Sequence, residues 1–212
     1  MLLADLRVEP GIVLEEKIGE GQHREVFRSG NLAVKILKPF RLKQRWLRTV
    51  RLPLQIYIQT KYAIEDFNQH EQENYWRLAG FIPRDSSTLF NRIYWAGYYE
   101  GQSISISDLV LNDDGSFAKS LAKSGVILDT KFWNGLDEIE TLLLSRKMFF
   151  IGINDDNVLV QTKNGVQQPV LVDYKWLGRE AYPCQFWLRW EIGLRRKLKS
   201  KFQRMRDLYK PR

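Results

Sequence analysis

The chain is organised around residues 149–176, FFIGINDDNVLVQTKNGVQQPVLVDYKW. Two apolar runs, FFIGI and VLV, flank the polar segment 154–157, and a turn at 163–165 leads into a third apolar run. The pattern predicts strand, turn, strand, with Asn157 entering the first strand and Asp173 leaving the second. Such a hairpin brings an amide and a carboxylate to one edge, where their oxygens suit a hard divalent cation. An ordinary surface hairpin, in which these side chains serve only the turns, is the alternative.

The composition is that of a soluble globular protein. The chain has 212 residues, 44% of them hydrophobic and 27% charged, which is enough for one domain or two small lobes that share a cleft. Cys184 is the single cysteine, so an internal disulfide is excluded and a reducing compartment is indicated. Asp5 and Glu9 interrupt the N-terminal apolar residues, and no apolar stretch approaches the roughly 20 residues of a membrane span. We therefore expect a cytoplasmic protein.

The net charge of +8 is unevenly distributed. Basic residues gather in 35–51 and 189–212, whereas 65–73 and 108–114 are acidic by comparison. Two basic segments predict an anionic partner, such as a membrane surface, an acidic protein or, with less support, nucleic acid. A solvated face balanced by local acids is the alternative.

A glycine-containing turn lies between two short β-like runs, 12–18 and 24–28. Gly19 and Gly21 are small enough to let backbone N–H groups approach phosphate oxygens. Arg24 stands where the third glycine of G-x-G-x-x-G would fall, so this motif by itself is a weak signal.

A third predicted strand, 32–37, carries Lys35 in an apolar setting. The order of strand, glycine turn, strand and strand with lysine matches a phosphate-covering hairpin followed by a phosphate-binding lysine. A strand-end lysine that reaches solvent is the alternative for Lys35. Residues 54–80 predict a helix with Glu71 on its inward face, where it could pair with Lys35; Glu73 is the fallback, and a solvent-facing glutamate is the alternative for both.

The rest of the chain predicts further strands and helices. Residues 89–99 and 102–110 are β-prone, and 116–124 and 131–147 have helical patterns. Residues 185–209 form a basic amphipathic helix. Its apolar stripe, which includes Leu194, Leu198, Phe202, Met205 and Leu208, is expected either to dock on the protein body or to lie on an anionic membrane.

Five segments occur in the order found in protein kinases: IGEGQHREVFR, LAVKIL, NYWRLAGFIPR, FFIGINDDNVLV and PVLVDYKW. Over roughly residues 15–205 the chain resembles the YrbL-like proteins of bacteria, which are named for the PhoP regulatory network. This family is protein-kinase-like. The resemblance implies a single kinase-like domain over 1–212 with a compact, bilobal α+β fold. Its parts would be a small β-rich N-lobe (1–99), a reduced helical C-lobe carrying the metal hairpin (100–184) and a basic C-terminal helix (185–212).

The resemblance also implies roles for individual residues, with ATP and Mg²⁺ as cofactors. Gly19 and Gly21 would cover the nucleotide phosphates. Lys35 would contact these phosphates with Glu71 as its partner. Asn157 and Asp173 would bind Mg²⁺.

The sequence departs from the kinase pattern at the catalytic base. Gly152 occupies the position of the usual aspartate, five residues before Asn157. Positioned acid–base help contributes about 10²–10⁴-fold, so the missing carboxylate makes fast catalysis doubtful without abolishing transfer. Asp155 is a weak replacement candidate, for which a turn role is the alternative. Asp173-Tyr174-Lys175 also lacks the glycine of D-F-G, so activation-loop switching is not expected.

These observations predict a nucleotide-binding protein that is either a weak phosphotransferase or a pseudokinase with a regulatory role. One alternative is a kinase for a lipopolysaccharide-core sugar or another small hydroxyl acceptor at the inner membrane face, where the basic segments would hold it peripherally. The other alternative is a non-enzymatic module that binds a polyanion.

Overall fold

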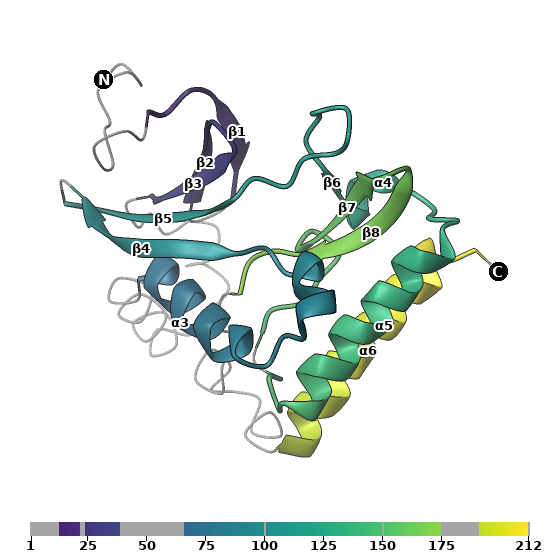
Figure 1. Ribbon diagram of the computed structural model, residues 1–212. Coiled ribbons are helices and arrows are strands. Elements are labelled where there is room, and N and C mark those ends of the chain that lie inside the picture. The colour runs from purple at the N-terminus through teal and green to yellow at the C-terminus, as the bar shows by residue number, and fades with distance from the viewer. Residues whose placement is uncertain are drawn as a thin grey trace, which may run out of the picture. The chain divides into compact units, whose positions relative to one another are not determined.

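The computed structural model describes residues 13–21, 24–38, 66–99, 101–149, 151–174 and 191–211. Contacts divide the chain into two compact units: residues 1–70 with 94–107, and residues 71–93 with 108–212. Figure 1 labels the helices and strands of both units. Most of the predicted basic segment 35–51, the first half of the predicted helix 54–80 and Cys184 lie outside the described residues.

The first unit is built on a five-stranded sheet with the order β1-β2-β3-β5-β4. The strands are β1 (Lys17–Glu20), β2 (Arg24–Ser29), β3 (Leu32–Leu37), β4 (Ile93–Tyr99) and β5 (Gln102–Asp108). The strands predicted at 24–28, 32–37 and 102–110 are confirmed within a few residues, whereas the strand expected over 12–18 begins only at Lys17. Strand β5 pairs with β3 and belongs to this unit. The lobe boundaries at residues 99 and 184 stay a prediction.

This sheet has one apolar face and one polar face. Antiparallel partners project to the same side and successive residues alternate, so the pairing Phe27↔Val34 defines one face and Val26↔Lys35 the other. The apolar face carries a small buried cluster: Leu14, Phe27, Val34, Ile36, Ile104 and Ile106. The turn between β2 and β3 is made by Gly30, whose φ of 59° lies in the left-handed region that glycine tolerates.

Helix α3 (Phe67–Ala79) begins in the first unit and continues into the second. The Asp66 carboxylate caps it by accepting hydrogen bonds from the backbone N–H of Asn68 (2.9 Å) and of Gln69 (3.3 Å). Glu71 and Leu78 are fully buried, which confirms the predicted inward face.

Besides the greater part of α3, the second unit contains a three-stranded sheet, β6-β7-β8, and three further α-helices within the described residues. Its elements are the 3₁₀ helix η2 (Arg84–Leu89), β6 (Lys119–Ser120), α4 (Leu121–Ser124), α5 (Thr130–Ser145), β7 (Val158–Lys163), β8 (Val166–Leu171) and α6 (Glu191–Tyr209). Strands β7 and β8 pair from Val158↔Leu171 to Lys163↔Val166. The hairpin predicted from residues 149–176 is therefore present, and its turn places Asn164 and Gly165 at φ of 52° and 71°, as a two-residue I′ turn requires.

The prediction of a helix over 116–124 was wrong for its first half. Lys119 and Ser120 pair with Val160 and Leu159 of β7, so this segment adds a short strand to the hairpin before α4 begins. The pairing is non-local, and the helical periodicity of the segment alone did not reveal it.

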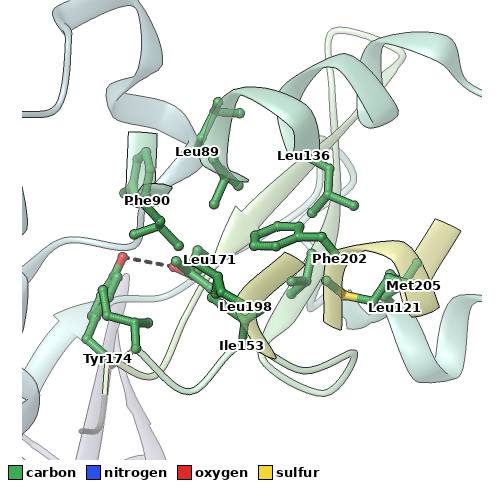
Figure 2. Close-up of a cluster of buried hydrophobic side chains, with 14 of the residues drawn as sticks. Leu89, Phe90, Leu121, Leu136, Ile153, Leu171, Tyr174, Leu198, Phe202 and Met205 are labelled. Atoms are coloured by element: carbon green, nitrogen blue, oxygen red, sulfur yellow. Dashed lines mark hydrogen bonds between the residues drawn. The ribbon is translucent and has the colours of Figure 1, made fainter. Parts of the chain in front are cut away.

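Helices α5 and α6 lie side by side and close the core of the second unit (Figure 1). Figure 2 shows Leu136 of α5 facing Phe202 and Leu198 of α6, next to Leu171 of β8. Burying a large apolar side chain contributes about 1.5–3 kcal/mol, so this core is a main source of stability. Gly135 lets α5 approach β8 closely, because a Cβ at this position would lie 2.9 Å from the Pro169 ring.

The predicted basic helix thus docks its apolar stripe on the protein body. Leu198, Phe202 and Met205 are buried, whereas Leu208 is 53% exposed and Tyr209 packs against the core instead. None of the helices within the described ranges is long and apolar enough to span a membrane.

Candidate functional site

The glycine turn lies at the end of β1, where the backbone N–H of Gly21 donates to the carbonyl of Arg24 (2.8 Å). A Cβ at Gly19 would lie 3.7 Å from the Val26 Cβ, and a Cβ at Gly21 would lie 3.7 Å from the Arg24 carbonyl oxygen. Both are ordinary van der Waals distances, so packing in the first unit does not require glycine at either position. Two glycines that the fold does not need leave room beside the turn for a ligand to approach the backbone.

Charged side chains hold the glycine turn from the face of the hairpin that lies opposite to Lys35. Glu20 pairs with Lys17 (2.7 Å) and with Lys38, whose ammonium also donates to the Gly21 carbonyl (3.0 Å). The hydrogen bonds from Lys17 and then from Lys38 lower the pKa of the exposed Glu20 carboxyl to about 2. Glu20 pairs with Glu25 across the strands, whereas Val26 pairs with Lys35, so the charged cluster and Lys35 occupy different faces.

Lys35 is buried at 8% exposure in the middle of β3. The alternative of a strand-end lysine reaching solvent therefore does not describe it. The Lys35 side chain projects from the polar face of the sheet, as that of its partner Val26 does. Asn68 donates a hydrogen bond to the Lys35 carbonyl (3.4 Å). Gly19 and Lys35 both pair with Val26 of β2, from its two sides, so they lie at one level of the sheet in the first unit. Contact of Lys35 with phosphate stays a prediction.

In the second unit, the end of β8 places Asp173 beside Asn157. The backbone N–H of Val172 donates to the Asn157 carbonyl (2.9 Å), directly beyond the pair Val158↔Leu171. Asp173 has a φ of 67°, a left-handed conformation that is uncommon for a residue other than glycine. Such strained positions concentrate at functional sites and persist where the surroundings hold them.

The residue after Asp173 provides this restraint. Tyr174 is fully buried, and its hydroxyl is 2.9 Å from both the Asn91 and the Leu171 carbonyl oxygens; Figure 2 shows the second of these contacts. Its backbone is held by α3, where Glu71 accepts from the Tyr174 N–H (3.4 Å) and Asn74 donates to the Tyr174 carbonyl (2.8 Å).

Burial raises the pKa of the Tyr174 phenol well above its usual value, so the hydroxyl keeps its proton as a donor. Glu71, which the sequence assigned to Lys35, thus also borders the segment that carries Asp173. The pairing of Glu71 with Lys35 stays a prediction.

Gly152, which the sequence analysis aligned with the usual catalytic aspartate, contacts Asn157 through its backbone carbonyl. The Asn157 amide nitrogen donates to the Gly152 carbonyl (2.7 Å), which turns the amide oxygen of Asn157 away from Gly152. The Asn157 backbone N–H donates to the Asn154 side-chain oxygen (2.8 Å), which closes the preceding turn. The first contact holds the Asn157 side chain and the second holds its backbone.

Asp155 is occupied by another contact. Its carboxylate accepts a hydrogen bond from the Tyr209 hydroxyl at the end of α6 (2.7 Å), and this bond raises the pKa of the Tyr209 phenol. Its backbone carbonyl accepts from the Ala122 N–H (3.1 Å). These contacts favour the structural alternative; a proton-accepting role for Asp155 has no further support.

The donors at the hairpin edge fit a small hard cation. Among the described residues, no group of three or more His, Cys, Asp or Glu side chains is arranged to hold a metal ion. An amide oxygen and a carboxylate are hard oxygen ligands of the kind that Mg²⁺ takes, since Mg²⁺ keeps several water ligands and binds only one or two protein groups. Binding of Mg²⁺ by Asn157 and Asp173 stays a prediction.

Two features of the site were missed by sequence reasoning. The first is the buried network of Arg24 and Asn68 with the serines of β5, and the second is the hydroxyl anchor of Tyr174. The segment QSISISD, 102–108, alternates serine with isoleucine, and this alternation was the available signal for a strand with one polar and one apolar buried face.

Comparisons with known proteins place the fold. A solved structure described as the apo form of PpkA-294 is similar to this chain with a TM-score of 0.52 and 16% sequence identity, covering 86% of this chain and 64% of that one. The kinase domain of Mycobacterium tuberculosis PknI, in a point-mutant form, gives a TM-score of 0.49 and 14% identity, covering 82% of this chain and 63% of that one. No family model and no curated protein matches the sequence.

At these identities the likeness shows the fold alone. The predicted class is confirmed: the chain has an α+β protein-kinase-like fold, with a β-rich first unit. The chain spans somewhat less than two thirds of the length of the kinase structures it matches.

Proposed function

We propose that this protein binds ATP·Mg²⁺ and acts as a weak phosphotransferase or as a pseudokinase with a regulatory role, as a member of the YrbL type linked to the PhoP network. The observation that carries the proposal is the β7–β8 hairpin. We infer from its register that Asn157, whose amide is oriented by the Gly152 carbonyl, lies near Asp173, whose left-handed backbone is held by the contacts of Tyr174. A hairpin that served only its turns could still orient the Asn157 amide through Gly152, but it would not need the left-handed backbone of Asp173.

The proposed roles follow from these positions. Asn157 and Asp173 would hold Mg²⁺, which when bound neutralises charge on the transferring phosphoryl group. Gly19 and Gly21 would allow the backbone to approach the phosphates, and Lys35 would contact them with Glu71 as its partner. Burial strengthens the attraction of the Lys35 ammonium for phosphate, since the local dielectric is lower than that of water.

The rate of any transfer is expected to be low. Gly152 has no side chain to accept the proton of an acceptor hydroxyl, and the carboxylate of Asp155 is bonded to Tyr209. The absence of a positioned base lowers the rate of transfer by about 10²–10⁴-fold. A slow kinase and a regulatory nucleotide sensor would therefore differ only in this rate.

The test is ATP binding by calorimetry with and without Mg²⁺, for wild type and Asp173→Ala. We expect Mg²⁺ to tighten ATP binding to wild type and to have little effect on the variant, because the carboxylate ligand is gone. Asp156→Ala is the matched control, since Asp156 is an exposed aspartate of the same loop. Equal Mg²⁺ dependence in wild type and Asp173→Ala would overturn the metal role.

A second candidate is a kinase for a lipopolysaccharide-core sugar or another small hydroxyl acceptor, held peripherally at the inner membrane face. The exposed basic residues of α6 favour it: Arg195, Arg196, Lys199 and Arg204. Flotation with vesicles containing anionic lipid should carry the protein to the top fraction, and a charge-reversed α6 variant should stay at the bottom.

Binding to nucleic acid would instead show a steep dependence on salt concentration, and this result would favour a polyanion-binding module. We also propose a cytoplasmic location, with peripheral membrane attachment in the second candidate function, the membrane-held kinase.

A further inference from the structure

Arg24 begins β2 at the position where G-x-G-x-x-G has its third glycine, and it is buried at 6% exposure. In the β2–β3 ladder Arg24 pairs with Leu37, and Val26 pairs with Lys35. Residues 24 and 26 project to the same side of β2, so Arg24 and Lys35 lie on the same face of the sheet. Diagonal neighbours across a pair of strands are about 7–8 Å apart, which is within reach of two long side chains.

Asn68 holds the Arg24 side chain. Its amide oxygen accepts a hydrogen bond from the Arg24 guanidinium (3.3 Å) and one from the Ser105 hydroxyl (3.3 Å). Its amide nitrogen donates to the carbonyl and the hydroxyl of Ser103 (both 3.0 Å) and to the Lys35 carbonyl (3.4 Å). Asn68 is fully buried, so this one amide ties Arg24 to the strand that carries Lys35.

A glycine at the third position of the motif serves to bring backbone close to phosphate, and arginine removes that space. A buried guanidinium, however, offers planar N–H donors that match phosphate oxygens in pairs. Gly19 and Gly21 keep the approach to the turn open, and the Gly21 N–H fixes the Arg24 backbone through its carbonyl (2.8 Å).

We propose that Arg24 is a second phosphate-binding cation of the glycine turn, which acts with Lys35 and contacts the triphosphate through its guanidinium. This inference rests on the proposed function, because it assigns a further residue to the same nucleotide site. The competing role is purely structural: Arg24 would only join β2 to the start of α3 through Asn68.

The experiment separates these roles by using ligands with and without phosphate. Binding of ATP, of adenosine and of inorganic tripolyphosphate without Mg²⁺ is measured by calorimetry for wild type, Arg24→Met and Arg24→Lys. Arg28→Met is the matched control, since Arg28 lies on the same strand, is partly exposed and pairs with Glu15 and Glu16.

We expect Arg24→Met to weaken ATP and tripolyphosphate binding by about 10- to 100-fold, the usual effect of removing a hydrogen bond to a charged group. Adenosine binding should change by less than about twofold, Arg24→Lys should recover part of the loss because it keeps the charge, and Arg28→Met should match wild type. An equal loss for ATP and adenosine, or wild-type protein that does not bind tripolyphosphate, would overturn the assignment.

Failure of the proposed function gives a different result. Wild type that binds tripolyphosphate through Arg24 but shows no preference for ATP would contradict nucleotide binding and leave the role of Arg24 intact. If Arg24→Met does not fold, the side-chain Nε–H resonance of Arg24 in wild-type protein decides the question by NMR. A shift on titration with tripolyphosphate supports the contact, and an unchanged resonance rejects it.

Discussion

The glycine turn of the first unit and the hairpin edge of the second unit are held in place by different interactions. In the first unit, polar side chains fix the strands beside the glycine turn, with Asn68 joining Arg24, Ser103 and the Lys35 carbonyl. In the second unit, backbone hydrogen bonds of the hairpin and one buried aromatic residue, Tyr174, fix the metal edge above an apolar core. A polar network loses several partners when one member is removed, whereas a hairpin on an apolar core tolerates the loss of a single polar group.

The largest effect is expected from Asn68→Ala, which tests the first half of this comparison. The truncation leaves the buried guanidinium of Arg24 and two serines without their amide partner, and we expect a loss of about 3 kcal/mol in the free energy of unfolding. Urea denaturation measures it, with the exposed neighbour Gln69→Ala as the control. A loss no greater than that of the control would show that the network does not stabilise the first unit.

Glycine substitutions sharpen the contrast between scaffold and site. Gly135→Ala places a Cβ 2.9 Å from Pro169, and we expect it to lower the free energy of unfolding by about 2 kcal/mol through overpacking.

Gly21→Ala meets only ordinary contacts, so stability should change by less than about 0.5 kcal/mol while ATP binding weakens. Thermal unfolding and calorimetry check both variants. The reverse pattern, with Gly21→Ala unstable and normal in ATP binding, would make the glycine turn structural.

Tyr174→Phe tests the second half. The variant keeps the buried ring and removes the hydroxyl contacts to Asn91 and Leu171, so the expected loss of stability is only about 1 kcal/mol. Because the same residue restrains Asp173, the gain in ATP affinity on adding Mg²⁺ should fall several-fold. Unchanged Mg²⁺ dependence, measured by calorimetry, would separate Tyr174 from the metal edge.

The smallest effect concerns the exposed charges on the outer face of the glycine turn. The folded-state pKa of Glu20 is lowered from 4.5 to about 2, so its contribution to stability is present above pH 4.5 and is lost as the pH falls toward 2. The difference in Tm between wild type and Glu20→Gln should therefore be greatest at neutral pH, vanish at the acid end and shrink in high salt. A Tm difference that does not depend on pH would rule out this ion pair as its source.

The sequence was sufficient where the determinants are local. The Asn164-Gly165 turn between two apolar runs predicted β7 and β8, because turn type and register follow from neighbouring residues. The fold class was also predicted correctly, from the kinase-like order of the motifs along the sequence.

Contacts between distant positions were not predictable from local patterns. Arg24 meets Asn68 across 44 positions, and Asn91 meets Tyr174 across 83. Each pair depends on the registers of several elements at once, which periodicity does not encode. The short strand β6 was missed for the same reason, since its pairing with β7 decides its structure.

The contact between Tyr209 and Asp155 has a practical consequence for making the protein. The last turn of α6 donates a hydrogen bond to the loop that presents Asn157, and the Tyr209 carbonyl accepts another from Ile127. A truncation that removes Tyr209 would cut this anchor of the loop that presents Asn157, so fragments used for nucleotide-binding work should retain α6 through Tyr209.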